Sequence, residues 1–125
     1  MAVKRKQTRR KLAPVSLQDI IIQSIQDKKG HNIVSLDLKG VNDAIADTFI
    51  ICEADNTIQI KAIADNIMEQ TKKVMGELPW HSEGMKRLEW VLIDYVDTVV
   101  HIFLPQTRSF YQLEELWHDA KFAEH

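Results

Sequence analysis

The fold is decided by the stretch WVLIDYVDTVVHIFL, residues 90–104. Both flanks of this stretch are rich in β-branched and aromatic residues, which are typical of strands. Residues 89–95 and 98–104 are therefore predicted to form a β-hairpin around Val96-Asp97. Because tight hairpin turns prefer residues that tolerate positive φ, the β-branched Val96 predicts another turn type or a bulge.

If Tyr95 lies opposite Thr98, the hairpin has two chemically different faces. The first face is apolar apart from one phenol and carries Val91, Ile93, Tyr95, Val100, Ile102 and Leu104. The second face is mixed and carries Trp90, Leu92, Asp94, His101 and Phe103. The apolar face is the natural core face. The mixed face resembles the centre of a protein interface, in which Trp anchors dominate binding; the alternative is that a helix covers it and buries Trp90.

Upstream of the hairpin, the patterns predict a helix and two strands. Ser16 followed by Asp19 is typical of a helix N-cap, and apolar residues then recur at helical spacing until Gly30. Residues 31–38 alternate, which predicts a strand. Thr48 to Cys52 is apolar without alternation, which favours a central strand covered on both faces, although periodicity alone leaves a buried helix open.

Further elements complete the predicted order α, β, β, α, β, β, β, α. Thr57 is expected to cap a helix that ends at Gly76, and residues 79–83 are expected to form a short edge strand. Ser109 and Gln112 match a capping box that would open a third helix. The residues expected to point inward from this helix are Phe110, Leu113, Leu116, Trp117 and Ala120. The fold class is therefore α/β (α+β), with a mixed sheet of about five strands packed with helices.

Length and charge divide the 125-residue chain into two parts. Residues 1–15 are expected to be a disordered basic arm, because they contain six lysines and arginines, no acidic residue and few apolar side chains. Residues 16–125 are expected to be one domain. That domain has 10 of the 16 basic residues and all 18 acidic ones, a net charge of −8, which argues against a general nucleic-acid binder.

Composition also indicates the compartment. The basic start lacks the apolar run of a secretory signal peptide, and apolar runs long enough for a membrane helix are missing from the sequence. Cys52 is the only cysteine, so no internal disulfide can form. A soluble, cytoplasmic protein is expected, with Cys52 as a small buried hydrophobe.

The sequence offers little catalytic chemistry. Its four glycines cannot assemble a phosphate-binding loop, and the His81-x-Glu83 pair lacks the downstream cysteines of a zinc deaminase. His101 could act as a base oriented by Asp94, but a structural histidine is the favoured interpretation.

The best enzymatic alternative is a nucleotidyltransferase-like metal site. Asp37, Asp47 and Asp94 are associated with predicted strands, and hard cations such as Mg²⁺ prefer carboxylate ligands. The Gly-Ser turn and paired Asp-x-Asp ligands of such enzymes are missing from the sequence. Capping, turn and surface roles are therefore favoured for these carboxylates, and neither a metal nor a cofactor is expected.

The hairpin and its flanks carry an ordered set of motifs. These are Glu83-Gly84, Trp90-Val91-Leu92-Ile93-Asp94-Tyr95, Asp97-Thr98-Val99-Val100-His101-Ile102-Phe103, Arg108, Tyr111, Leu113-Glu114 and Leu116-Trp117, preceded by Asp47-Thr48-Phe49-Ile50-Ile51 and Lys61-Ala62-Ile63-Ala64-Asp65. In this order they closely resemble the ribosomal silencing factor family (RsfS, also called Iojap or YbeB), over roughly residues 17–120. Val96 departs from the family, in which glycine is common at that turn.

The resemblance implies an α/β domain related in fold to nucleotidyltransferases but without their catalytic residues. Family members bind the universal protein fourteen of the large ribosomal subunit and sterically prevent the small subunit from joining. They thereby repress translation when nutrients are limiting, and relatives act in organellar ribosome biogenesis. Members are often described as homodimers when free.

The resemblance and the mixed face together identify the expected contact residues. The expected partner-binding residues are Glu83, Trp90, Leu92, Asp94, His101 and Phe103. The tryptophan and leucine would pack on the ribosomal protein, the two carboxylates would meet its basic side chains, and the histidine and phenylalanine would support or extend the patch. The arm is expected either to contact ribosomal RNA or to be a solvated tail. A general RNA-binding assembly factor acting through the arm is the alternative function.

Overall fold

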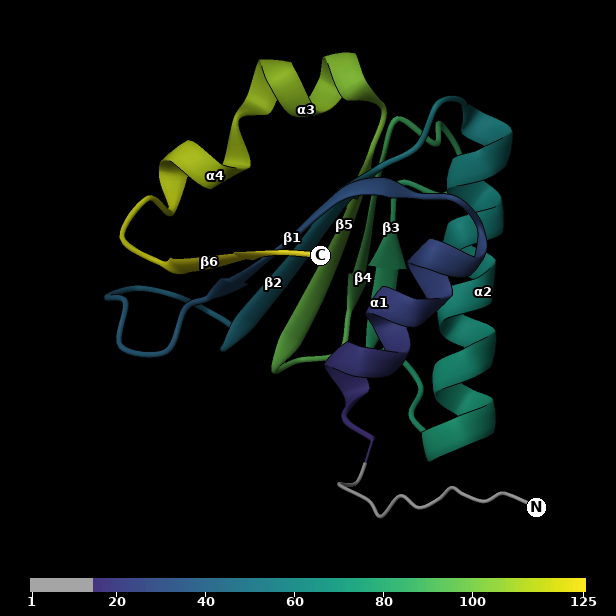
Figure 1. The fold of residues 1–125 in the computed structure, drawn as a ribbon, viewed down its shortest axis with the longest axis horizontal. Helices are drawn as coiled ribbons and strands as arrows, with labels where there is room; N and C mark the ends of the chain where they lie inside the picture. Colours follow the sequence, from purple (N-terminus) through teal and green to yellow (C-terminus); the bar gives the residue numbers. More distant parts are fainter. Residues whose placement is uncertain (1–14) are drawn as a thin grey trace, which may run out of the picture.

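The computed structural model describes residues 15–125. Its elements are α1 (Leu17–Asp27), β1 (His31–Asp37), β2 (Thr48–Glu53), α2 (Thr57–Met75), β3 (His81–Glu83), β4 (Trp90–Asp94), β5 (Thr98–Phe103), α3 (Pro105–Tyr111), α4 (Leu113–Leu116) and β6 (Lys121–Glu124). The described residues form a six-stranded sheet in the order β3-β4-β5-β2-β1-β6 (Figure 1). The predicted α/β fold with a mixed sheet is confirmed, with one strand more than expected. The expected basic arm lies outside the described residues except for Val15.

The two central strands, β2 and β5, run parallel to each other, whereas the other neighbouring pairs are antiparallel. Every residue of β5 and all but Glu53 of β2 are buried. Strands covered on both faces can be apolar at successive positions, which explains why Thr48 to Cys52 does not alternate. The prediction of a central strand there is confirmed.

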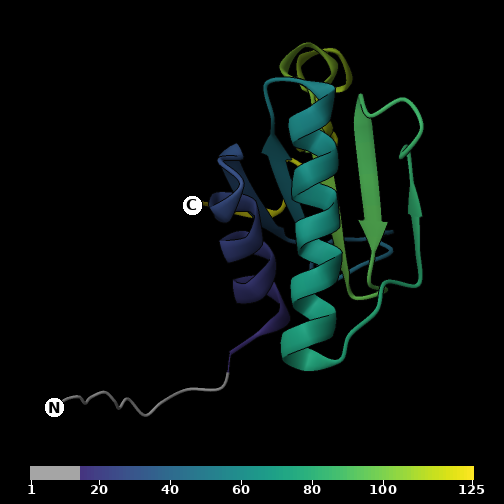
Figure 2. The same ribbon diagram turned by 90° about the vertical axis from the view of Figure 1, so that its right-hand side faces the viewer.

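Helices α1 and α2 pack side by side on one face of the sheet (Figure 2). Ser16 caps α1: its hydroxyl accepts a hydrogen bond from the Asp19 N–H at 3.1 Å, and the Asp19 carboxylate accepts one from the Ser16 N–H. The predicted N-cap is confirmed, and the two hydrogen bonds together form a capping box. The predicted cap of α2 is wrong by one residue, because the side chain of Asn56, not of Thr57, accepts the Gln59 N–H at 2.9 Å. No helix among the described residues is long and apolar enough to cross a membrane.

The hairpin of β4 and β5 has the predicted register. Trp90 lies opposite Phe103, Leu92 opposite His101, and Asp94 opposite Val99. The apolar face of this hairpin joins the core beneath α1 and α2. The mixed face belongs to a second apolar cluster on the opposite side of the sheet, which includes Leu36, Leu38, Phe49, Ile51, Phe103 and Leu113.

Val96 occupies an unusual turn between β4 and β5. Its φ is +77°, and the Asp97 N–H donates to the Tyr95 carbonyl at 3.0 Å, a γ-turn pattern. The Asp94 carboxylate stabilises the turn by accepting the Val96 N–H at 2.7 Å. The expected departure from a regular two-residue turn is confirmed, and the conformation is strained for a β-branched residue.

Replacing Val96 with glycine is expected to raise the free energy of unfolding by about 1 kcal/mol, because glycine adopts positive φ without steric conflict. Val96 is exposed, so little packing is lost. Equilibrium urea unfolding measures the change. Val15→Gly is the matched control, because Val15 is equally exposed but has no positive φ. An equal or lower unfolding midpoint for Val96→Gly would show that the turn is not strained.

The predicted third helix is wrong in its start and its continuity. Pro105 begins α3, as its fixed φ favours the first helical position, and Gln112 then interrupts the helix with a φ of +47°. The interruption turns Leu113 into the core but leaves Phe110 and Leu116 exposed, although both were expected to point inward. The chain after α4 returns as β6 and pairs antiparallel with β1. This strand gives little sequence signal, because all four of its residues are exposed.

Candidate partner-binding face

The sheet is open over β3 and β4 on the side opposite α1 and α2. Strand pairing places His81 beside Asp94 and Glu83 beside Leu92, so these side chains share one face with Trp90. We call this surface the docking face, defined by His81, Glu83, Trp90, Leu92 and Asp94. The helices α3 and α4 lie over the neighbouring part of the sheet (Figure 1). They leave Glu83 exposed and the other four residues partly exposed.

Trp90 is half-buried at the border of this face. Its ring packs on Phe103 at a centroid distance of 4.8 Å and on Tyr111 of α3 at 4.7 Å. Its indole N–H donates to Nδ1 of His101 at 3.1 Å. The tryptophan is thus held in one orientation by the residues behind it, while part of its ring stays open to a partner. The alternative that a helix covers the mixed face and buries Trp90 holds only in part, because Tyr111 of α3 packs on Trp90 but leaves it partly exposed.

His101 and Phe103 lie beneath the surface, 4% and 0% exposed. These two residues were expected either to support the contact patch or to extend it. Because they are buried, they can only support it in this conformation. Burial lowers the pKa of His101 to about 4, so the imidazole is neutral near pH 7. Because Nδ1 accepts the hydrogen bond from Trp90, the proton of the neutral ring lies on Nε2.

The polar part of the docking face is organised around His81. Its Nε2 lies 2.9 Å from a carboxylate oxygen of Glu83, and its Nδ1 lies 3.7 Å from a carboxylate oxygen of Asp94. The other Asp94 oxygen accepts the Val96 N–H, so this carboxylate has a fixed direction. Sequence reasoning considered His81 only as part of a zinc motif. Its i, i+2 spacing from Glu83 on an edge strand was the pattern that could have placed both on one face.

A hollow of about 430 Å³ continues the docking face toward α3. Trp90, Tyr111 and Met85 supply apolar parts of its lining, and Glu83 stands at its border with the docking face. An apolar depression beside a half-buried tryptophan is suited to receive a side chain from a partner.

The alternative, a nucleotidyltransferase-like metal site, is not assembled in the described part of the chain. Asp37 is on β1 and Asp94 on β4, with β2 and β5 between them, so they do not form one site. Within residues 15–125, no group of three His, Cys, Asp or Glu side chains is arranged to hold a metal ion. Cys52 is buried, as predicted, and burial raises the pKa of its thiol to about 12, so it is protonated and a poor nucleophile.

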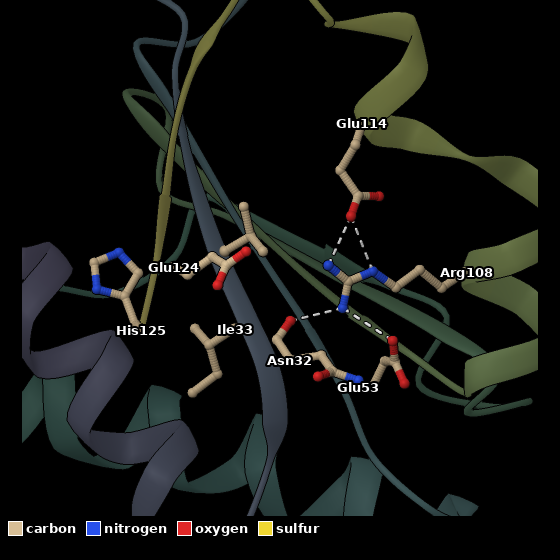
Figure 3. A pocket seen from close by; sticks show the side chains of 8 residues that line it. Asn32, Ile33, Glu53, Arg108, Glu114, Glu124 and His125 are labelled. Carbon is tan, nitrogen blue, oxygen red and sulfur yellow. Dashed lines mark hydrogen bonds and ion pairs between the residues drawn. The ribbon is translucent and has the colours of Figure 1, made fainter.

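Arg108 makes a buried ionic network over β1 and β2, away from β3 and β4 (Figure 3). The guanidinium donates to the Asn32 carbonyl at 2.7 Å, to Glu53 at 3.1 Å, and to Glu114 at 2.7 and 3.2 Å. It therefore joins β1 and β2 to α3 and α4. An adjoining hollow of about 530 Å³ is bordered by this network and by Glu124. Most of the guanidinium donors are already used within the protein, so we interpret Arg108 as a structural residue.

The geometry defines a class of protein: a small α/β domain whose open acidic and aromatic sheet face is suited to bind another macromolecule. The sequence profile of the RsfS family, described as ribosomal silencing factor during starvation, matches residues 11–125. The chain therefore belongs to the ribosomal silencing factor family, as the motifs predicted.

Individual relatives agree with this assignment. The chain is 38% identical over 109 residues to the ribosomal silencing factor RsfS of Bacillus subtilis, covering 87% of this chain and 91% of that protein. It is 37% identical over 108 residues to the RsfS of Halalkalibacterium halodurans, covering 86% and 91%. A crystal structure of a Chromobacterium violaceum protein matches with a TM-score of 0.76 at 34% identity, covering 83% of this chain and 88% of that one. A more distant mouse relative, named mitochondrial assembly of ribosomal large subunit protein 1, is 30% identical over 73 residues, covering 57% and 32%.

Proposed function

We propose that this chain is a ribosomal silencing factor that represses translation when nutrients are limiting. It binds the large ribosomal subunit through the universal protein fourteen and sterically prevents the small subunit from joining. The open docking face is the observation that carries this proposal, because it combines a preoriented tryptophan with the fixed carboxylate of Asp94 and the exposed carboxylate of Glu83. Such a factor acts in the cytoplasm and needs neither a catalytic group nor a cofactor.

Trp90 and Leu92 make the apolar part of the proposed contact. Both are partly exposed, and Trp90 is already ordered by Phe103, Tyr111 and His101, so binding costs little of its side-chain entropy. Large aromatic anchors at the centre of an interface carry much of the binding free energy. The hollow beside Trp90 would receive a side chain of the ribosomal protein and remove the rest of the indole from water.

Glu83 and Asp94 make the electrostatic part of the proposed contact. The Glu83 side chain is 67% exposed and the Asp94 side chain 20% exposed, so a partner's basic groups can reach both. Residues 16–125 carry a net charge of −8, which favours the approach of a basic surface. Charges of this kind set orientation and the rate of association more than affinity.

Silencing by this route is steric rather than chemical. A bound body of about 110 residues has a radius of gyration of roughly 13 Å, which is large compared with the gap between closely packed macromolecular surfaces. Occupying a surface that the small subunit must approach is therefore sufficient to prevent joining. A role in large-subunit biogenesis is compatible with the same contact, and the name of the mouse relative supports it.

Replacing Trp90 with alanine is expected to weaken binding to isolated large subunits by at least about 2 kcal/mol, a factor of roughly 30. Co-sedimentation with purified subunits measures this change, and binding to the isolated ribosomal protein tests the identity of the partner. Trp90→Phe is the second variant, because it retains ring packing on Phe103 and Tyr111 while removing the hydrogen bond to His101.

The matched control is Trp117→Ala. Trp117 is also half-buried in the same apolar cluster and packs on Phe49 at 5.9 Å, but it lies outside the docking face. The Trp117→Ala substitution should lower the free energy of unfolding without weakening the binding of the folded protein to large subunits. Equal loss of binding in Trp90→Ala and Trp117→Ala would assign the effect to stability and contradict the proposed contact.

Two further expectations stay predictions. One is a homodimer in the free state, and the other is contact between the basic arm and ribosomal RNA. Neither is needed for the docking face to bind.

A further inference from the structure

His81 lies between two carboxylates of the docking face. Its Nε2 is 2.9 Å from a carboxylate oxygen of Glu83 on β3, and its Nδ1 is 3.7 Å from a carboxylate oxygen of Asp94 on β4. The ring of Trp80, in the segment before β3, packs edge to face on the imidazole at a centroid distance of 4.6 Å. The imidazole is therefore held with an anionic acceptor near each of its two nitrogens.

A neutral imidazole can satisfy only one of these carboxylates, because it carries one proton and an ionised carboxylate has only acceptor oxygens. The short distance to Glu83 requires that proton on Nε2, since a bare Nε2 would place its lone pair against the carboxylate oxygen. Nδ1 is then an acceptor that faces the Asp94 oxygen, a second acceptor. It is a buried atom without a hydrogen-bond partner among residues 15–125. A proton on Nδ1 would supply the donor that this pair of acceptors lacks.

The Asp94 carboxylate is placed to receive such a proton. One of its oxygens accepts the Val96 N–H at 2.7 Å, and the other oxygen faces His81. The gap of 3.7 Å is too long for a hydrogen bond, and a shift of less than about 1 Å would close it. A protonated ring could therefore donate to Glu83 and to Asp94 at the same time.

Protonation also changes the charge that the docking face presents. With a neutral ring, Glu83 and Asp94 together carry two negative charges, and with a protonated ring the cluster retains one. Lys86 and Arg87 line the hollow beside Glu83, and Arg87 lies 3.8 Å from Glu89. These cations are present in both states, so the charge difference comes from His81.

We infer that the protonation state of His81 regulates the docking face. The neutral ring leaves the face acidic and open to a basic partner, whereas the protonated ring binds both carboxylates and weakens the attraction. Histidine is the side chain that ordinarily changes its charge between pH 5 and pH 8, so acidification should weaken docking. That docking engages a basic ribosomal partner rests on the proposed function; the protonation site itself does not.

The test measures co-sedimentation of the full chain with isolated large subunits at about pH 7.5 and about pH 5.5, at constant ionic strength. Wild-type affinity is expected to fall about 5-fold, the order of one exposed ion pair. The His81→Gln variant does not titrate at this position, so its affinity should change less than about 2-fold between the two pH values. The His81→Lys variant keeps a positive charge beside the carboxylates and should bind weakly at both.

The matched control is His31→Gln. His31 lies 2.9 Å from the single carboxylate of Asp55, outside the docking face, and its replacement should leave the wild-type pH dependence intact. His101 stays neutral in the native protein at pH 5.5, because burial lowers its pKa to about 4. Circular dichroism confirms that each variant is folded at both pH values. The same fall in affinity for the wild type and for His81→Gln would overturn the inference.

A second measurement needs no partner. Nitrogen-15 NMR of the free protein should show a neutral His81 ring with its proton on Nε2 at about pH 7.5 and both nitrogens protonated at about pH 5.5. A proton on Nδ1 at the higher pH would contradict the arrangement.

The inference and the proposed function can fail separately. Loss of subunit binding in Trp90→Ala, with no difference between the wild type and His81→Gln in pH dependence, would leave the docking contact standing and overturn its regulation by His81. Undiminished subunit binding by Trp90→Ala would contradict the docking contact and with it this regulation, whatever the NMR shows of the protonation site.

Discussion

Replacing Arg108 with methionine is expected to lower the free energy of unfolding by about 3 to 5 kcal/mol, the largest effect of any single substitution considered for this protein. Arg108 is 8% exposed. Its guanidinium neutralises Glu53 and Glu114, whose side chains are 15% and 28% exposed. Removing it leaves two carboxylates close together without a counter-charge and leaves the Asn32 carbonyl without its donor. Equilibrium unfolding in urea measures the loss.

The matched control for Arg108→Met is Arg87→Met. Arg87 is 83% exposed and lies 3.8 Å from Glu89, so its loss should change stability by less than about 1 kcal/mol. A second variant, Arg108→Met combined with Glu53→Gln, should recover part of the stability, because it removes one of the uncompensated charges. Similar changes for Arg108→Met and Arg87→Met, or no recovery in the double variant, would show that the buried network is not the source of the effect.

Stability is expected to fall as the pH decreases from about 6.5 to about 4 because of His101. Burial lowers the pKa of His101 to about 4 in the native protein, below its ordinary value of 6.5. In this window the unfolded chain binds a proton that the native chain does not, so stability present above pH 6.5 is lost as the pH falls through the folded pKa. The contribution of this single group is on the order of 3 kcal/mol.

The variant His101→Gln isolates this contribution. Glutamine does not titrate, and its amide oxygen can still accept the indole N–H of Trp90. The difference in unfolding free energy between the wild type and this variant should change by about 3 kcal/mol between pH 7 and pH 4. His118→Gln is the control for the substitution itself, because the His118 side chain is 74% exposed. Parallel curves for the wild type and His101→Gln would contradict a buried neutral imidazole.

Local patterns predicted most of the sheet correctly. The alternation on both sides of Val96 predicted the register of β4 and β5, because a shift of one residue would have moved every apolar side chain to the wrong face. The continuous apolar run from Thr48 to Cys52 predicted a strand covered on both sides. The N-cap pattern at Ser16 and the glycine at position 76 predicted the start of α1 and the end of α2.

The C-terminal third was predicted less well, because its structure depends on distant residues. A capping pattern at Ser109 and Gln112 was outweighed by Pro105 at the helix start and by the positive φ of Gln112. Arg108 holds α3 and α4 through groups on β1 and β2, which are more than 50 residues away along the chain. No local pattern could have predicted those partners. Strand β6 was not predicted for the same reason. It forms by pairing with β1, and none of its four residues is buried.

The sequence by itself determined the α/β class, the register of the hairpin and membership of the ribosomal silencing factor family, because these depend on periodicity and on ordered motifs. Only the tertiary structure decided which part of the mixed face is open. Two residues of that face, His101 and Phe103, are buried because Trp90 packs on both of them, Phe49 packs on His101, and Leu113 joins the cluster around Phe103. His81, in contrast, reaches the surface from a neighbouring strand. Exposure depends on what packs above a strand, and alternation specifies only the face to which a side chain points.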